Sequence, residues 1–157
     1  NNVQSMLFWL MGDLSQSRVN PAHYLLLLLG LVGGIFISRS LNVLIRGELL
    51  AVSLGVNVQS LRLLLFFSAS VFTATAVTVA GSVGFVGLII PHILRLLGAR
   101  DHRLLIPTCV LLGGSFLVLA DSLARTLIAP QQLPVGVVTA VIGVPAFILI
   151  LRSTIRK

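Results

Sequence analysis

Charged residues are scarce in this sequence of 157 amino acids. Asp, Glu, Lys and Arg together make up 10% of it, and only four residues are acidic. Hydrophobic residues make up 57%, and the mean hydropathy is +1.08. Soluble domains carry about 25% charged residues, and a short soluble chain cannot bury so large an apolar fraction. The composition excludes a disordered chain and an ordinary soluble enzyme, and it indicates an integral membrane protein.

The sequence also contains only one cysteine and none of the catalytic motifs searched for. The single cysteine, Cys109, permits no intrachain disulfide, which excludes a disulfide scaffold. No G-x-S-x-G, H-E-x-x-H or P-loop motif occurs, and His23, His92 and His102 do not follow metal-ligand spacing. All four carboxylates lie at or beyond the ends of apolar runs, which leaves no candidate for a proton relay. We expect no catalytic residue, metal or cofactor in this chain.

An initiator Met is absent, because the sequence begins Asn1-Asn2-Val3. A signal peptide is not recognisable either, since there is no basic n-region and no small-residue cleavage site. We expect the chain to be a fragment of a longer membrane protein.

Long uncharged segments predict transmembrane helices. A helix needs about 20 apolar residues to cross about 30 Å of hydrocarbon. The 32 uncharged residues between Arg62 and Arg95 are too many for one crossing, and Gly81, Gly84 and Gly87 interrupt them. The fold class predicted is an all-α, polytopic membrane helix bundle with five transmembrane helices, at about 22–38, 63–80, 85–97, 104–120 and 135–151.

The segment 85–97 is short, so it either crosses the membrane or re-enters on the same side. If it crosses, only Arg18 and Arg125 lie opposite the other basic residues. These nine are Arg39, Arg46, Arg62, Arg95, Arg100, Arg103, Arg152, Arg156 and Lys157. Basic residues favour the cytoplasmic side. We therefore predict a crossing, with Asn1 outside and the C-terminus in the cytoplasm.

Two segments outside the spans also have helical character. In residues 1–13, apolar side chains follow helical spacing, which predicts a short helix on the outer surface. In the cytoplasmic loop 39–62, Glu48 begins a short apolar helix that Gly55 ends. That helix either lies on lipid or docks a cytoplasmic partner, and the pattern leaves both interpretations open.

Two further patterns have both a structural and a functional interpretation. The small residues from Gly81 to Gly87 indicate close helix packing or a flexible turn that lines a pathway. Asp121 and Arg125 have i, i+4 spacing, which fits an intrahelical ion pair. Arg125 could equally dock an acidic partner outside the cell.

An ordered set of motifs resembles one known family. The set comprises GSVGFVGLIIPH at 81–92, Arg95, Gly98, the run DHR at 101–103, Pro107, Asp121, Arg125, LPVG at 133–136, Thr139, Gly143, Pro145 and Phe147. Trp9, the pair at 11–12 and the segment 47–55 fit as well. Over nearly its whole length, the chain resembles the C-terminal half of FecCD-type permeases. These belong to bacterial ABC importers of iron-siderophores, haem and cobalamin.

The resemblance implies a fold, partners and site residues. Residues 1–157 would be the second half of a ten-helix permease in the cytoplasmic (inner) membrane. It would work with a second permease chain, cytoplasmic ATP-binding subunits and an extracytoplasmic binding protein, and ATP would be bound by the partner ATPase. The implied ATPase-coupling residues are Gly47, Glu48, Ala51, Leu54 and Gly55, and Arg125 would dock the binding protein. The implied structural or pathway residues are Gly81, Gly84, Phe85, Gly87, Pro91, His92, Arg95, Asp121, Pro134 and Gly136.

Some points depart from the family or remain open. Gln132 stands where the family usually has an acidic residue, and Leu49 and Val52 replace residues that are commonly polar. The expected cargo is an iron-siderophore, with haem and cobalamin as alternatives. A non-transporting assembly subunit, in effect a degenerate half-permease, is a second interpretation. A metal-ion permease would need His or carboxylate residues in mid-span, and the sequence has none.

Overall fold

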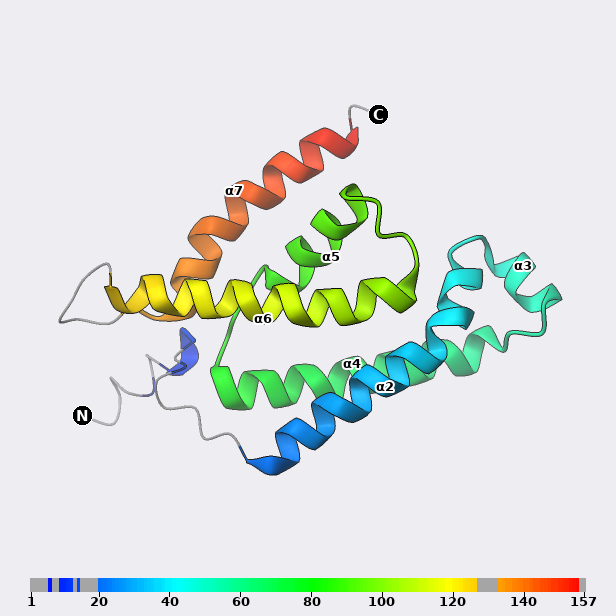
Figure 1. The fold of residues 1–157 in the computed structure, drawn as a ribbon, viewed down its shortest axis with the longest axis horizontal. Coiled ribbons are helices and arrows are strands. Elements are labelled where there is room, and N and C mark those ends of the chain that lie inside the picture. The colour runs from blue at the N-terminus through cyan, green and yellow to red at the C-terminus, as the bar shows by residue number, and fades with distance from the viewer. Residues whose placement is uncertain (1–5, 7–8, 13, 15–19, 127–132, 156–157) are drawn as a thin grey trace.

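The computed structural model describes residues 6, 9–12, 14, 20–126 and 133–155, and this part of the chain is helical without any strand. The helices are α2 (Pro21–Leu44), α3 (Glu48–Ser53), α4 (Val58–Ala80), α5 (Val86–Leu96), α6 (His102–Thr126) and α7 (Val135–Ile155), as Figure 1 shows. The predicted all-α class is confirmed. Of the predicted outer-surface helix, Met6, Trp9 and Leu10 are helical, and most other positions lie outside the described residues.

Each of the five predicted spans coincides with a helix. Three helices, α2, α4 and α6, are long and apolar enough to cross a membrane, whereas α5 and the apolar part of α7 are shorter. The predicted ends were wrong in places, since α2 continues six residues beyond Ser38 and α6 continues to Thr126. Hydrophobicity marks the lipid-covered part of a helix, but capping groups decide where the helix stops.

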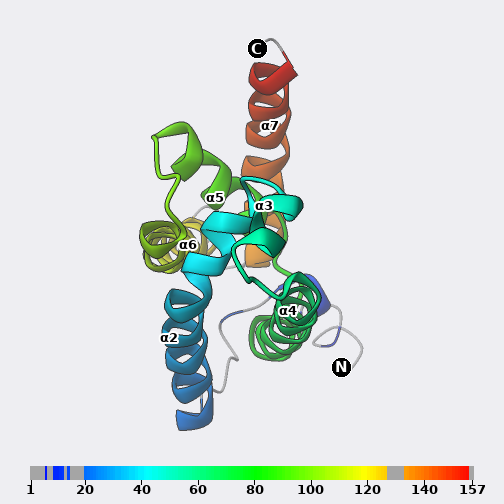
Figure 2. The ribbon, with the colours of Figure 1, turned by 90° about the vertical axis from the view of Figure 1, so that its right-hand side faces the viewer.

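Helix α6 lies at the centre of the arrangement. Helices α5 and α7 pack on one side of it and α2 on the other, with α4 next to α2 (Figures 1 and 2). One small core joins α5 to α6 through Ile90, Leu94 and Leu105. Another joins α6 to the start of α7 and contains Ala120, Ala124, Val135 and Val138. The remaining helix faces expose many large apolar side chains, as lipid-facing or protein-facing membrane helices do.

The contacts at the two ends of the bundle fix the course of α5. At one end, the Asn42 Nδ2 of α2 lies 2.6 Å from the Asp101 Oδ1 that precedes α6. At the other end, the Val135 amide that begins α7 donates to the Gly12 carbonyl over 2.8 Å. Helix α6 can begin where α2 ends only if α5 returns the chain to that end. The geometry supports the crossing arrangement over the re-entrant one, and the side that faces the cytoplasm stays a prediction.

Candidate functional site

The predicted coupling segment forms a well-defined short helix. Helix α3 follows α2 after three residues, and a glycine-closed turn ends it. The Gly55 amide donates to the Val52 carbonyl, and the Val56 amide donates to the Ala51 carbonyl, both over 2.9 Å. This pair of bonds is a Schellman motif, which needs a left-handed residue after the C-cap. Gly55 supplies it with φ +80°, where a side chain would be strained.

Two contacts hold α3 against the rest of the chain. Ala51 has no exposed surface, and Val58 and Leu61 at the start of α4 are buried too. The Glu48 carboxylate pairs with the Arg62 guanidinium of α4 at 2.6 Å, although both side chains are more than half exposed. Such exposed pairs contribute about 0–1 kcal/mol. Burial of Ala51 therefore anchors α3, and the exposed ion pair adds little to this.

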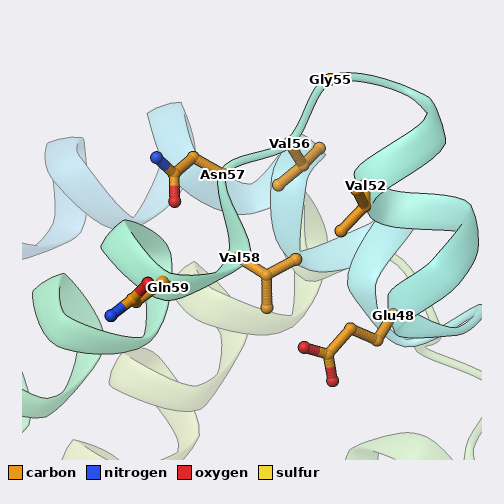
Figure 3. Close-up of a pocket in the computed structure, with 7 residues that line it drawn as sticks. All are labelled: Glu48, Val52, Gly55, Val56, Asn57, Val58 and Gln59. Carbon is orange, nitrogen blue, oxygen red and sulfur yellow. The ribbon is translucent and has the colours of Figure 1, made fainter.

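The outer side of α3 presents apolar groups. Leu49 is 89% exposed and Leu54 is 62% exposed. Between α3 and the start of α4 lies an open hollow of about 480 Å³, lined by Glu48, Val52 and residues 55–59. Figure 3 shows Val52 of α3 and Val58 of α4 at this hollow, with the Glu48 carboxylate beside them. An exposed apolar helix next to a hollow is suited to receive a partner.

The structure divides the five predicted coupling residues by exposure. Gly47, Glu48, Leu54 and Gly55 are accessible at the surface. Ala51 is inaccessible, so it supports α3 from below and cannot meet a partner directly.

At the opposite end, Arg125 lies on the last turn of α6. Its Nε donates to the Asp121 Oδ2 over 2.8 Å, and the Arg125 side chain remains 41% exposed. The predicted intrahelical ion pair is therefore present. The docking role of Arg125 stays a prediction, and Gln132 lies outside the described residues.

Beside this end, three chain segments approach one another at backbone distance. A Cβ at Gly136 of α7 would lie less than 3.0 Å from the carbonyl oxygens of Met11 and Ser82, and Gly81 is equally crowded by the Trp9 carbonyl. Pro134, just before α7, is buried. Small residues are needed here because no side chain fits between the backbones.

The turn between α4 and α5 combines close packing with an unusual backbone. Phe85 caps α5 with φ +67°, a conformation rare for a bulky residue. Its side chain lies where a Cβ on Gly143 of α7 would be. By contrast, a Cβ added at Gly84 or Gly87 would meet no other atom within 4 Å. Close packing thus explains Gly81, whereas Gly84 and Gly87 face open space in this chain.

The remaining motif residues lie along α5. Pro91 is inside the helix and half-buried, as is His92. Arg95 is exposed in the last turn, where a cation interacts favourably with the helix dipole. Across the described ranges, no three His, Cys, Asp or Glu side chains gather as metal ligands would.

Sequence reasoning missed the polar contact around Asn42. This residue is near the end of α2, and it bonds both Asp101 and His102, 59 and 60 positions further along the chain. The available signal was an amide just beyond an apolar run, which does not identify a partner so distant in sequence.

In the described residues, long apolar helices with a short exposed helix at one end define a multi-pass membrane protein. The chain belongs to the FecCD transport family, whose sequence profile matches residues 1–153. It is 45% identical over 153 residues to YvrB of Bacillus subtilis, an uncharacterized ABC transporter permease protein. It is 43% identical over 153 residues to the cobalamin import system permease BtuC of Halobacterium salinarum. It is 40% identical over 156 residues to the vitamin B12 import system permease BtuC of Escherichia coli.

The similarity extends over this chain but not over the whole of its relatives. The three alignments cover 96%, 96% and 99% of the chain, and 43%, 41% and 48% of the relatives. The chain thus spans somewhat less than half the length of these proteins. A solved ABC transporter described as of metal-chelate type, in an inward-facing conformation, superposes with a TM-score of 0.85 at 34% identity. That match covers 98% of this chain and 50% of the other.

Proposed function

We propose that residues 1–157 form the C-terminal half of the transmembrane permease of an ABC importer. The observation that carries the proposal is α3, an exposed apolar helix anchored by Ala51 and joined to two long membrane helices. Family membership and the 0.85 TM-score to an ABC transporter support the same function.

In this proposal the permease contributes no chemistry of its own. A cytoplasmic ATPase docks on α3 and the neighbouring hollow, and closure of the ATPase dimer displaces α3. Because α3 is packed between α2 and α4, its displacement tilts these helices and alternates access to a path between two permease chains. The free energy comes from ATP bound by the partner.

The outer end receives the delivered ligand. Arg125 of α6, exposed beside Asp121, is placed to meet an acidic group on an extracytoplasmic binding protein. The proposed location is the cytoplasmic membrane with the C-terminus inside, and the basic residues at the α3 end support this orientation.

The cargo we propose is a large metal chelate. Two of the relatives are named for cobalamin or vitamin B12 import, and the solved relative is described as of metal-chelate type. Ferric siderophores, haem and cobalamin all belong to this chemical class, and they require a wide path with few specific contacts.

The test is uptake of three radiolabelled ligands, a ferric siderophore, haem and cyanocobalamin, in cells with and without the full-length gene. We expect deletion to abolish uptake of one ligand and re-expression of the gene to restore it. A strain that lacks only the ATPase subunit is the control, and it should show the same loss. Unchanged uptake of all three would contradict the proposed cargo class, and loss that is independent of the ATPase would contradict the importer itself.

A further inference from the structure

The first turn of α6 is capped from two different parts of the chain. Asp101 is its own N-cap, since the Asp101 Oδ1 accepts the Arg103 backbone N–H over 2.9 Å. A second backbone donor in this turn, the His102 N–H, has no partner within the helix and donates to the Asn42 Oδ1 of α2, also over 2.9 Å. Helix N-termini leave such donors unpaired unless a side chain accepts them. Asn42 therefore completes a cap on a helix other than its own.

The charge on Asp101 fixes which way the Asn42 amide points. The hydrogen bond from the Arg103 backbone amide, and to a lesser extent the one from the Asn42 side chain, hold the pKa of Asp101 below its ordinary value. This carboxylate is therefore ionised at neutral pH. An ionised carboxylate only accepts, so the Asn42 Nδ2 must donate to it over 2.6 Å. The Asn42 Oδ1 then faces His102, where it lies 2.8 Å from the ring Nδ1. His102 must carry a proton on Nδ1 to bond there.

The stretch between Asn42 and α3 is hydrogen-bonded throughout. Successive amides of Ile45, Arg46 and Gly47 donate to carbonyls in the last turns of α2 at 3.0–3.1 Å. The Ala51 amide then donates to the Gly47 carbonyl over 3.0 Å, which begins α3. The connection contains no unbonded linker that could absorb movement, so a displacement of α3 is passed to the end of α2.

From these contacts we infer that Asn42, Asp101 and His102 form a polar clamp that makes the α3 end of α2 and the start of α6 move as one body. The inference rests on the proposed function for its consequence, which is that displacement of α3 reaches α6 and the helices packed on it. Asn42 and Asp101 are positioning residues in this scheme, since neither touches a ligand. Without the clamp, α3 would still move α2, but α6 would no longer follow.

Distance measurements between two spin labels test the clamp directly. The labels are placed at the exposed positions Ile45, beyond α2, and Leu111, on α6, after replacement of Cys109 by Ser. The full-length protein is studied in lipid nanodiscs, alone and with its ATPase and a non-hydrolysable ATP analogue. We expect one narrow distance distribution in both states for the otherwise native protein.

Two variants and one control then separate the clamp from general packing. Asn42→Leu keeps the branched shape of the side chain but removes all its hydrogen bonds to this end of α6, and we expect the distribution to broaden at least twofold. Asn42→Asp combined with Asp101→Asn exchanges donor and acceptor, so it can rebuild the bonds to His102 and Arg103, and it should restore the narrow distribution. Ser40→Ala alters a half-buried polar residue on the same helix and should change nothing.

An unchanged distribution in Asn42→Leu would overturn the clamp, as would a broad distribution in the exchanged pair. If Asn42→Leu does not fold, the exchanged pair against Asn42→Asp alone gives the same comparison, since two facing carboxylates break the contact. Failure of the proposed function has a different signature. In that case Asn42→Leu would still have a broader distribution than the native clamp, but the ATPase and nucleotide would leave that distribution unchanged, because α3 would not be displaced.

Discussion

Gly55 and Phe85 both hold the backbone at positive φ, but for different reasons. Gly55 closes α3 at little conformational cost, because glycine has no Cβ. Phe85 adopts φ +67° at a cost of about 1–3 kcal/mol, which its contact with Gly143 and the packing of α5 sustain. The first could be predicted from a glycine after a short apolar helix. The second could not, because nothing in the local sequence marks a bulky residue for the left-handed region.

Replacement of Gly55 tests the coupling role at a single residue. The space around it is open, so only the φ of +80° opposes a side chain. Gly55→Val should strain the end of α3 by about 1–3 kcal/mol. We expect a loss of transport per ATP hydrolysed of about tenfold, the equivalent of 1.4 kcal/mol. The measurement is ligand uptake and ATP hydrolysis in the same proteoliposomes.

Gly55→Asn is the matched control for this experiment. Asn tolerates the left-handed region better than a β-branched residue does. It should therefore retain most of the coupling. Equal losses in both variants would show that the backbone conformation is not what matters at this position.

Charge reversal at Arg125 tests the outer docking role. Arg125→Glu replaces an i, i+4 ion pair worth about 0.2–0.5 kcal/mol with a like-charge pair that destabilises the helix by a similar small amount. We expect normal membrane insertion and an affinity for the binding protein that falls at least about tenfold. Arg125→Lys should lose much less. An affinity unaffected by the reversal, measured at low ionic strength, would remove Arg125 from the docking surface.

At the scale of helices, apolar runs predicted where the elements are but not where they end. Asn20 is the N-cap of α2: its side chain accepts from the Ala22 amide while His23 reaches back to the Asn20 amide, and these are local signals. The other end of α2, at Leu44, is closed by backbone bonds from Ile45, Arg46 and Gly47, which no side-chain signal in the sequence marks. The sequence indicated close packing for the run from Gly81 to Gly87, but it could not tell that Gly81 packs while Gly84 and Gly87 face open space, since all three look alike in sequence.

The junction at the start of α7 gives a prediction for the stability of the bundle. A Cβ at Gly136 would meet backbone oxygens of Met11 and Ser82, which cannot rotate away. We expect Gly136→Ala to destabilise the protein by about 1–3 kcal/mol through overpacking. Gly33→Ala, on α2 with nothing within 4 Å, should be neutral or stabilising by up to about 1 kcal/mol. Melting temperatures in detergent compare them, and equal effects would argue against a tight junction.

For the whole molecule, the arrangement depends on contacts that no local pattern contains. The bond between Asn42 and Asp101 joins positions 59 residues apart and fixes which ends lie together. The distribution of basic residues favours the same arrangement through a different physical effect, the preference of Arg and Lys for one side of the membrane. Many large apolar side chains on the described helices remain exposed, as on helices that face lipid or other membrane helices.

The orientation can be tested with single cysteines in the Cys109→Ser background. Ser53→Cys on α3 and Thr126→Cys at the end of α6 both lie at exposed positions at opposite ends. We expect a membrane-impermeant maleimide to label position 126 in intact spheroplasts and position 53 only after permeabilisation. The reverse pattern would invert the orientation, and labelling of both from one side would contradict the course of α5.

The contact between Phe85 and Gly143 also restricts which substitutions these two positions can accept during evolution. Any side chain at position 143 would occupy the space of the Phe85 side chain, so that glycine cannot change alone. A smaller residue at position 85 would leave a void beside α7 before position 143 could fill it. Whichever of the two positions changes first, the intermediate protein with a single substitution is poorly packed. The two positions are therefore expected to be inherited together and to covary among descendants of this protein.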